Sequence, residues 1–173
     1  MSKRPPRHYW CACILHKLFN HWEPYADVVQ ELYQKALAGE LTIVTSTMSL
    51  VEVNGGRTGT DEVRARIRQL FRAGTSTLEI IEVDRDVAEK AGTWAAAGTL
   101  KSVDAVHLAT ALLVKCDEMV TTDDRLLTCA SWAEIPIHPP RLIGQGTVIP
   151  IGTDLSGVQR PIVQLPTTRE APQ

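Results

Sequence analysis

The stretch that decides the fold is "LKSVDAVHLATALL", residues 100–113. Apolar residues recur through it at helical spacing and form a wide stripe, which predicts a helix that is buried over much of its surface. The stripe consists of Ala105, Leu108, Ala109, Leu112, Leu113 and Cys116. A carboxylate, Asp104, stands where this helix opens, and carboxylates are seldom buried without a partner. The role of that acid is therefore the first question about function.

Short β-rich runs alternate with helical patterns on both sides of this stretch. Strand-type runs are found at residues 8–11, 41–45, 78–83, 118–122 and 133–139. Helical patterns are found at residues 12–20, 23–39, 46–53, 60–74, 84–98 and 103–116. This alternation predicts an α/β domain with a mainly parallel sheet that is covered by helices on both faces. Ligands of such sheets bind at the carboxyl ends of the strands, near the point where the strand order reverses.

Length and composition describe an ordinary globular domain. The chain has 173 residues, of which 44% are hydrophobic, and its net charge is −2. That charge gives no overall electrostatic argument for nucleic-acid binding, so any such argument has to come from a local patch. No apolar run is long enough to span a membrane or to act as a signal peptide, which predicts a cytoplasmic protein. A proline-containing segment without helical periodicity, residues 141–173, is expected to extend a domain formed by residues 1–140.

Three acids stand near junctions between a strand and the following helix: Glu52, Asp104 and Asp123. In a parallel sheet these junctions can meet at one edge. Two carboxylates about 4 Å apart repel each other by roughly 4 kcal/mol in a partly buried site, so a cluster needs protons or a cation. An all-oxygen site suits Mg²⁺ or Mn²⁺. Each acid taken singly is equally compatible with a helix cap, a turn or a solvated side chain.

The words "TSTMSLVEV" (45–53), "LKSVDAVHLATALL" (100–113) and "MVTTDDRL" (119–126), in this order, resemble the PIN-domain family, notably its VapC-like toxins. The resemblance covers residues 7–140. It implies a three-layer α/β/α sandwich with a mainly parallel central sheet. It also implies an endoribonuclease that depends on Mg²⁺ or Mn²⁺, pairs with a small antitoxin and forms a homodimer.

The resemblance also assigns roles by position. Asp104 and Asp123 match acids that bind the metal directly or through water, and Glu52 matches an acid that orients water or completes a second metal site. Thr121 matches the hydroxyl that commonly precedes the last acid. His107, one turn beyond Asp104, is expected to pack or to hydrogen bond beside the site.

One position departs from the family pattern. PIN domains usually end the first strand with Asp, whereas this chain has Cys11 there, and Cys13 falls at an apolar position. A thiol is mostly protonated at neutral pH and is a poor ligand for Mg²⁺. The chain is then an inactivated nuclease, a nuclease using a thiophilic ion such as Mn²⁺ or Zn²⁺, or one whose remaining acids give weak activity. We therefore expect reduced or absent activity; the alternative function is a catalytically silent module that binds RNA or a protein.

The same two cysteines raise the question of a disulfide. Side chains at i and i+2 diverge when they lie together in a strand, so a bridge between Cys11 and Cys13 is not expected there. Structural disulfides are also uncommon in the cytoplasm. The sequence therefore predicts neither a metal clip nor a redox pair at these positions.

A row of arginines is the candidate RNA-binding surface. Arg64, Arg68 and Arg72 recur every four residues on one helix, and Arg57 precedes it. The spacing places the three on one stripe, which can contact RNA phosphates, contact an acidic protein partner or simply face solvent.

Overall fold

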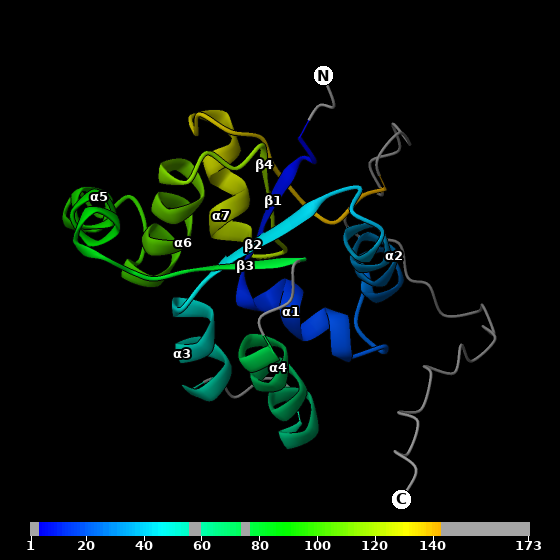
Figure 1. Cartoon of the computed structure of the whole chain (residues 1–173). Coiled ribbons are helices and arrows are strands. Elements are labelled where there is room, and N and C mark those ends of the chain that lie inside the picture. Colours follow the sequence, from blue (N-terminus) through cyan, green and yellow to red (C-terminus); the bar gives the residue numbers. More distant parts are fainter. Residues whose placement is uncertain (1–3, 56–59, 74–76, 143–173) are drawn as a thin grey trace, which may run out of the picture.

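The structure is a computed structural model that describes residues 4–55, 60–73 and 77–142. Its strands are β1 (Arg7–Trp10), β2 (Thr42–Ser46), β3 (Leu78–Ile81), β4 (Glu118–Val120) and β5 (Ile137–His138). Its helices are α1 (Ala12–Phe19), α2 (Ala26–Leu37), α3 (Met48–Gly55), α4 (Asp61–Ala73), α5 (Arg85–Ala96), α6 (Ser102–Leu113) and α7 (Asp124–Thr128), followed by a 3₁₀ turn at Cys129–Ser131. The strands form one sheet in the order β3-β2-β1-β4-β5 (Figure 1).

Every strand pairing in the described part of the chain is parallel. Helices α1, α2 and α4 lie on one side of the sheet, and α5, α6 and α7 lie on the other (Figure 1). Two hydrophobic cores result, because successive side chains of a strand point to opposite faces. Trp10 belongs to the core under α1, and its neighbour Tyr9 belongs to the core under α6. The expected three-layer α/β/α sandwich with a parallel central sheet is confirmed.

The strand order reverses beside β1, the central strand. The chain passes outward from β1 to β2 and β3, and then returns to place β4 on the other side of β1. The gap between the carboxyl ends of β1 and β4 is therefore the switch point of this sheet, where α/β folds bind their ligands. Because Trp10 pairs with Val120, the residues that follow these two strands lie next to each other.

The helix expected to be buried is buried. Eight residues of α6, from Asp104 to Ala111, are shielded from solvent, and the helix packs between the sheet and α5. Its N-cap residue is Lys101, so Asp104 is not the cap but lies within the first turn. The positive end of the helix dipole favours a carboxylate in this first turn.

The last described residues contact β4 of the sheet. Arg141 forms an ion pair with Glu118 of β4 at 3.8 Å, and the rest of the expected extension, residues 143–173, lies outside the described residues. Within the described ranges, no helix combines the length and apolarity that crossing a membrane requires.

Candidate functional site

The ends of β1 and β4 bring the first candidate residues together. Cys11 follows β1 directly and caps α1, while Thr121 follows β4. The Cys11 Sγ lies 3.2 Å from the Thr121 hydroxyl oxygen, and that oxygen accepts a hydrogen bond from the Asp123 N–H at 3.1 Å. The position expected to carry an acid and the last predicted acid thus share one hydroxyl partner.

Asp104 and Asp123 meet around one cation. The Arg125 Nε lies 3.1 Å from Asp104 Oδ2, and another guanidinium nitrogen of Arg125 lies 3.3 Å from Asp123 Oδ2. Asp123 is also the N-cap of α7, where its side chain accepts a hydrogen bond from the Arg125 N–H at 2.9 Å. The start of α7 therefore fixes both Asp123 and the arginine that links it to α6.

Asp104 is a buried acid. Its residue is 6% exposed, and its Oδ2 is buried without a hydrogen bond, the contact with Arg125 being an ion pair only. Burial raises the pKa of the Asp104 carboxyl, and the Asp123 and Glu52 carboxylates raise it further, while Arg125 and His107 lower it. A buried acid whose pKa is raised by other acids is a recognised mark of a functional site.

Glu52 lies at one end of a chain of hydrogen bonds that runs through His107 of α6 to Tyr9 of β1. Its Oε2 lies 2.6 Å from the Nε2 of His107, and the His107 Nδ1 lies 2.8 Å from the Tyr9 hydroxyl. That hydroxyl in turn donates a hydrogen bond to Ser46 Oγ at 3.0 Å. His107 is 1% exposed, so it positions Glu52 from within the core rather than facing the site itself.

The acids are only partly assembled as a metal site. Across the three described ranges, no group of three or more His, Cys, Asp or Glu side chains is arranged to hold a metal ion. Asp104 and Asp123 nevertheless fit a divalent cation by donor chemistry, because they are paired oxygen ligands that already require a positive charge between them. The buried Oδ2 of Asp104, which lacks a hydrogen-bond donor, is the specific observation in favour of this fit.

The sulfurs of Cys11 and Cys13 lie together, and both cysteines are free. The Sγ atoms are 2.6 Å apart, and Thr122 donates its backbone N–H to the Cys13 sulfur at 3.5 Å. Cys11 is the N-cap residue of α1 and Cys13 lies in the first turn, so the two residues do not share a strand. Burial raises the pKa of the Cys11 thiol, and a hydrogen bond from that thiol lowers the pKa of Cys13.

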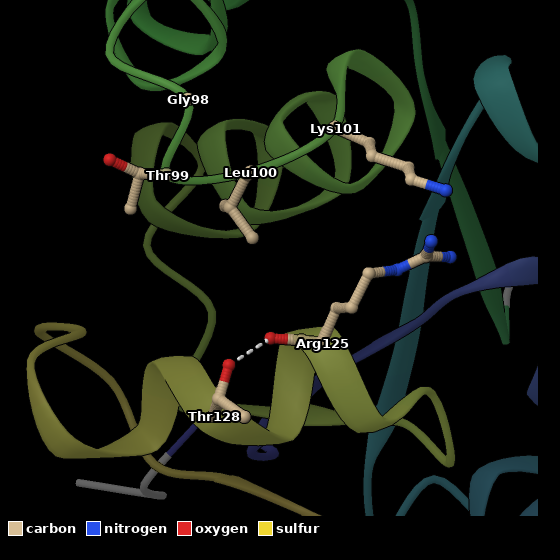
Figure 2. A pocket seen from close by; sticks show the side chains of 6 residues that line it. All are labelled: Gly98, Thr99, Leu100, Lys101, Arg125 and Thr128. Carbon is tan, nitrogen blue, oxygen red and sulfur yellow. Dashed lines mark hydrogen bonds between the residues drawn. The ribbon is translucent and has the colours of Figure 1, made fainter.

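A cavity of about 370 Å³ is lined in part by Arg125, the residue that pairs with Asp104 and Asp123 (Figure 2). It is lined by Gly98, Thr99, Leu100, Lys101, Arg125 and Thr128. Figure 2 shows the side chains of Lys101 and Arg125 extending toward the same side, one from the start of α6 and the other from α7. The acidic site therefore has a cationic neighbour, which is the charge distribution that a phosphate-bearing substrate requires.

The arginine surface is present on α4. Val63, Ile67, Leu70 and Phe71 form the buried face of this helix, which leaves Arg64 and Arg68 half-buried and Arg72 exposed. Arg64 pairs with Asp61 at 2.6 Å, and Arg68 donates to Asn54 at 3.1 Å. Arg57 lies outside the described residues.

Arg64 and Glu52 both act on His16 in α1. Burial lowers the pKa of His16; among the charged groups, Glu23 raises it most, Arg64 lowers it and Glu52 raises it. Both side chains are therefore within electrostatic range of the same imidazole. The first arginine of the stripe lies on the side of the molecule where Glu52 is held.

Two contributors to the site were not singled out from the sequence. Arg125 belongs to the motif "MVTTDDRL", where a basic residue after two acids suggests only a local ion pair with those neighbours. The ion pair between Arg125 and Asp104 is visible only in the tertiary structure. Tyr9 sits in an apolar strand run and reads as core. Only the packing of α6 against β1 shows that its hydroxyl supports His107.

Several solved structures share this fold, among them a toxin and a toxin–antitoxin complex. VapC20 of Mycobacterium tuberculosis, described as a sarcin–ricin loop cleaving toxin, aligns over 70% of this chain and 94% of its own, with 14% identity and a TM-score of 0.59. A toxin–antitoxin complex from Klebsiella pneumoniae aligns over 79% and 99%, with 24% identity and a TM-score of 0.52. VapBC2 of Rickettsia felis, bound to a promoter DNA fragment, aligns over 77% and 98%, with 18% identity and a TM-score of 0.55.

Comparison of the sequence itself gives the family. No curated protein matches the chain significantly. The family model described as PIN domain matches residues 12–130, which is well over half of the chain and includes Glu52, Asp104 and Asp123. The chain therefore belongs to the PIN domain family.

Proposed function

We propose that this protein is a divalent-metal-dependent endoribonuclease of low activity, acting as the toxin of a toxin–antitoxin pair. The observation that carries the proposal is that Asp104 and Asp123 both form ion pairs with the Arg125 guanidinium, near the switch point of the sheet. Membership of the PIN domain family and the toxin folds of the structural neighbours support it.

Asp104 and Asp123 would hold the metal ion, Mg²⁺ or Mn²⁺, and Glu52 would complete the acidic surround. A bound divalent ion supplies a water of lowered pKa and neutralises charge on the phosphate. The chain's own residues do the rest: His107 fixes the direction of Glu52, and Thr121 orients the Asp123 backbone. Lys101 and Arg125 line the cavity and would bind a neighbouring phosphate of the RNA.

Removal of divalent cations is the direct test of this function. We expect slow cleavage of single-stranded RNA by the purified chain with Mn²⁺ or Mg²⁺, and none after chelation, because carboxylates alone do not generate the nucleophile. Product ends read by gel electrophoresis and mass spectrometry measure this. Cleavage that persists unchanged in excess chelator would contradict the proposal.

Arginine substitutions test the RNA surface separately from the chemistry. Replacing Arg64, Arg68 and Arg72 together by Gln is expected to weaken RNA binding about 10-fold or more and to flatten its dependence on salt, since each phosphate contact releases counterions. Fluorescence anisotropy at several salt concentrations measures both quantities. Replacing Arg85 and Lys90 of α5 by Gln gives a charge-removal control on another face. An unchanged affinity and salt slope would remove α4 from the RNA interface.

The structural neighbours include complexes of a toxin with its antitoxin. We propose a small antitoxin as the physiological partner of this chain, with a homodimer of the chain as the unit that binds it. Expression with candidate neighbouring reading frames, followed by size-exclusion chromatography with light scattering, tests both points. As part of the same proposal, the protein acts in the cytoplasm.

A second function has its own support. Cys11 replaces an expected acid, and Arg125 already neutralises the two acids that meet. These observations favour a PIN-domain module without catalysis that binds RNA or a protein partner. Such a module would bind RNA with equal affinity in the presence and absence of Mn²⁺ and would leave the RNA intact.

A further inference from the structure

The cysteine pair at the end of β1 is a second reactive centre beside the acids. Its two sulfurs are in direct contact, so the side chains are already placed for a bond between them. All four cysteines of the chain are free, and this pair is the one for which a sulfur–sulfur contact is found among the described residues.

The backbone between the cysteines permits that bond. Ala12 is the first residue of α1, and a residue in helical conformation leaves its two neighbours with Cα atoms about 5.4 Å apart. That separation lies within the range of about 4.4–6.8 Å found for disulfides. In an extended strand the two Cα atoms would lie about 6.6 Å apart on one face, close to the upper limit of that range, so the helical conformation of Ala12 brings the pair nearer.

The two thiols are unequal in the way that thiol–disulfide exchange requires. Cys13 is less buried than Cys11, lies in the first turn of α1 and receives a hydrogen bond from the Thr122 N–H, and the last two features favour a thiolate there. Cys11 is 3% exposed and donates toward Cys13. The less buried sulfur is thus the attacking group, and the more buried sulfur is placed to resolve the product.

We propose that Cys11 and Cys13 form a reversible oxidation site that is converted to an internal disulfide by exchange with a low-molecular-weight disulfide. The Cys13 thiolate attacks one sulfur of the small disulfide, whose S–S bond breaks and releases one thiolate. Cys11 loses its proton and attacks the Cys13 sulfur, which releases the second thiolate. The cysteine pair loses two electrons and two protons, and the small disulfide gains them as two thiols.

The site differs in kind from the proposed nuclease chemistry and does not depend on it. Thr121 contacts both sulfurs, at 3.2 Å and 3.6 Å, and its oxygen also receives the Asp123 N–H. A change in the sulfurs is therefore one contact away from Asp123. If both proposals hold, oxidation also alters the acidic site; if nuclease activity is absent, the thiol chemistry is unaffected.

Intact-protein and peptide mass spectrometry of the full chain, incubated with glutathione disulfide, tests the site. We expect the wild-type chain to lose two hydrogen atoms and to yield a peptide in which Cys11 and Cys13 are joined, without bound glutathione. The Cys11→Ser variant is expected to keep one glutathione on Cys13, because the resolving sulfur is gone. The Cys13→Ser variant is expected to remain unmodified at Cys11.

The control is Cys116→Ser, since burial raises the pKa of Cys116 to about 12 and that thiol faces no other sulfur in the described structure. It should oxidise at Cys11 and Cys13 as the wild type does. A wild-type chain that stays fully reduced, or that retains glutathione on Cys13, would overturn the proposal. The wild-type measurement tests the proposal even if a variant fails to fold. The Asp104→Asn variant should form the same disulfide between Cys11 and Cys13 as the wild type, whatever the effect of this substitution on RNA cleavage.

Discussion

Replacing Cys11 by Asp is expected to increase metal-dependent RNA cleavage by about 10- to 100-fold over the parent chain. Cys11 follows β1 directly beside Thr121, the hydroxyl that contacts the last acid, so a carboxylate there joins the acidic edge. Attraction between two opposite unit charges about 4 Å apart is worth roughly 4 kcal/mol near a protein surface. About one third of that energy is enough to change metal affinity tenfold. Cleavage of single-stranded RNA in Mg²⁺ and in Mn²⁺ measures the gain.

Two further measurements make this result specific. The Cys11→Asn variant has a side chain of nearly the same shape as that of Cys11→Asp but without the negative charge. Its rate of RNA cleavage should stay at that of the parent chain. Because Cys11 is buried, the new carboxylate of the Cys11→Asp variant should lower thermal stability without metal, and Mn²⁺ should restore more stability to it than to the parent. If Cys11→Asp gains neither activity nor metal-dependent stability, Cys11 does not stand at the position of a metal-binding acid.

Replacing Asp104 by Asn is expected to lower the remaining cleavage by about 100-fold or more while raising stability by about 1 kcal/mol at neutral pH. The loss follows because Asp104 supplies the buried carboxylate oxygen without a hydrogen-bond donor. The gain follows because burial and the Asp123 charge raise the pKa of Asp104, so its ionised form is unfavourable in the folded state. Opposite effects on activity and stability are the signature of an acid retained for function.

The pH dependence of stability gives an independent check on Asp104. A carboxyl whose pKa is raised by folding destabilises the protein when ionised, and this cost disappears as the pH falls through the folded-state pKa. The stability difference between Asp104→Asn and the parent should therefore shrink toward acidic pH. Urea unfolding at several pH values measures it, with the exposed Glu31→Gln on α2 as the control. An Asn variant that is less stable at neutral pH would show that Asp104 serves mainly as the partner of Arg125.

The fold was largely predictable because its signals are local. The helical stripe of residues 100–113 and the β-rich runs depend on neighbours a few positions away. Periodicity identifies which face of an element is buried, and alternation of strands with helices implies a parallel sheet. The three motifs that carried the family resemblance are also contiguous words, and the family is confirmed.

The site depended on contacts that no local pattern records. Arg125 joins Asp104 across 21 positions of sequence only because α6 and α7 lie on the same face of the sheet. The route from Tyr9 through His107 to Glu52 crosses three elements. The cysteine pair shows the same limit at short range, since the predicted start of the helix at residue 12 is correct but does not reveal that the Cys11 and Cys13 sulfurs lie together.

Sequence by itself therefore determined the architecture and the family, and it supplied the acids that we propose form the site. Tertiary structure alone decided how those acids are neutralised, which of them is buried, and that Cys11 and Cys13 form one reactive centre. The physical reason is the range of the interactions. Hydrophobic periodicity is written along the chain, whereas ion pairs and hydrogen bonds are set by side-chain directions after distant elements have packed.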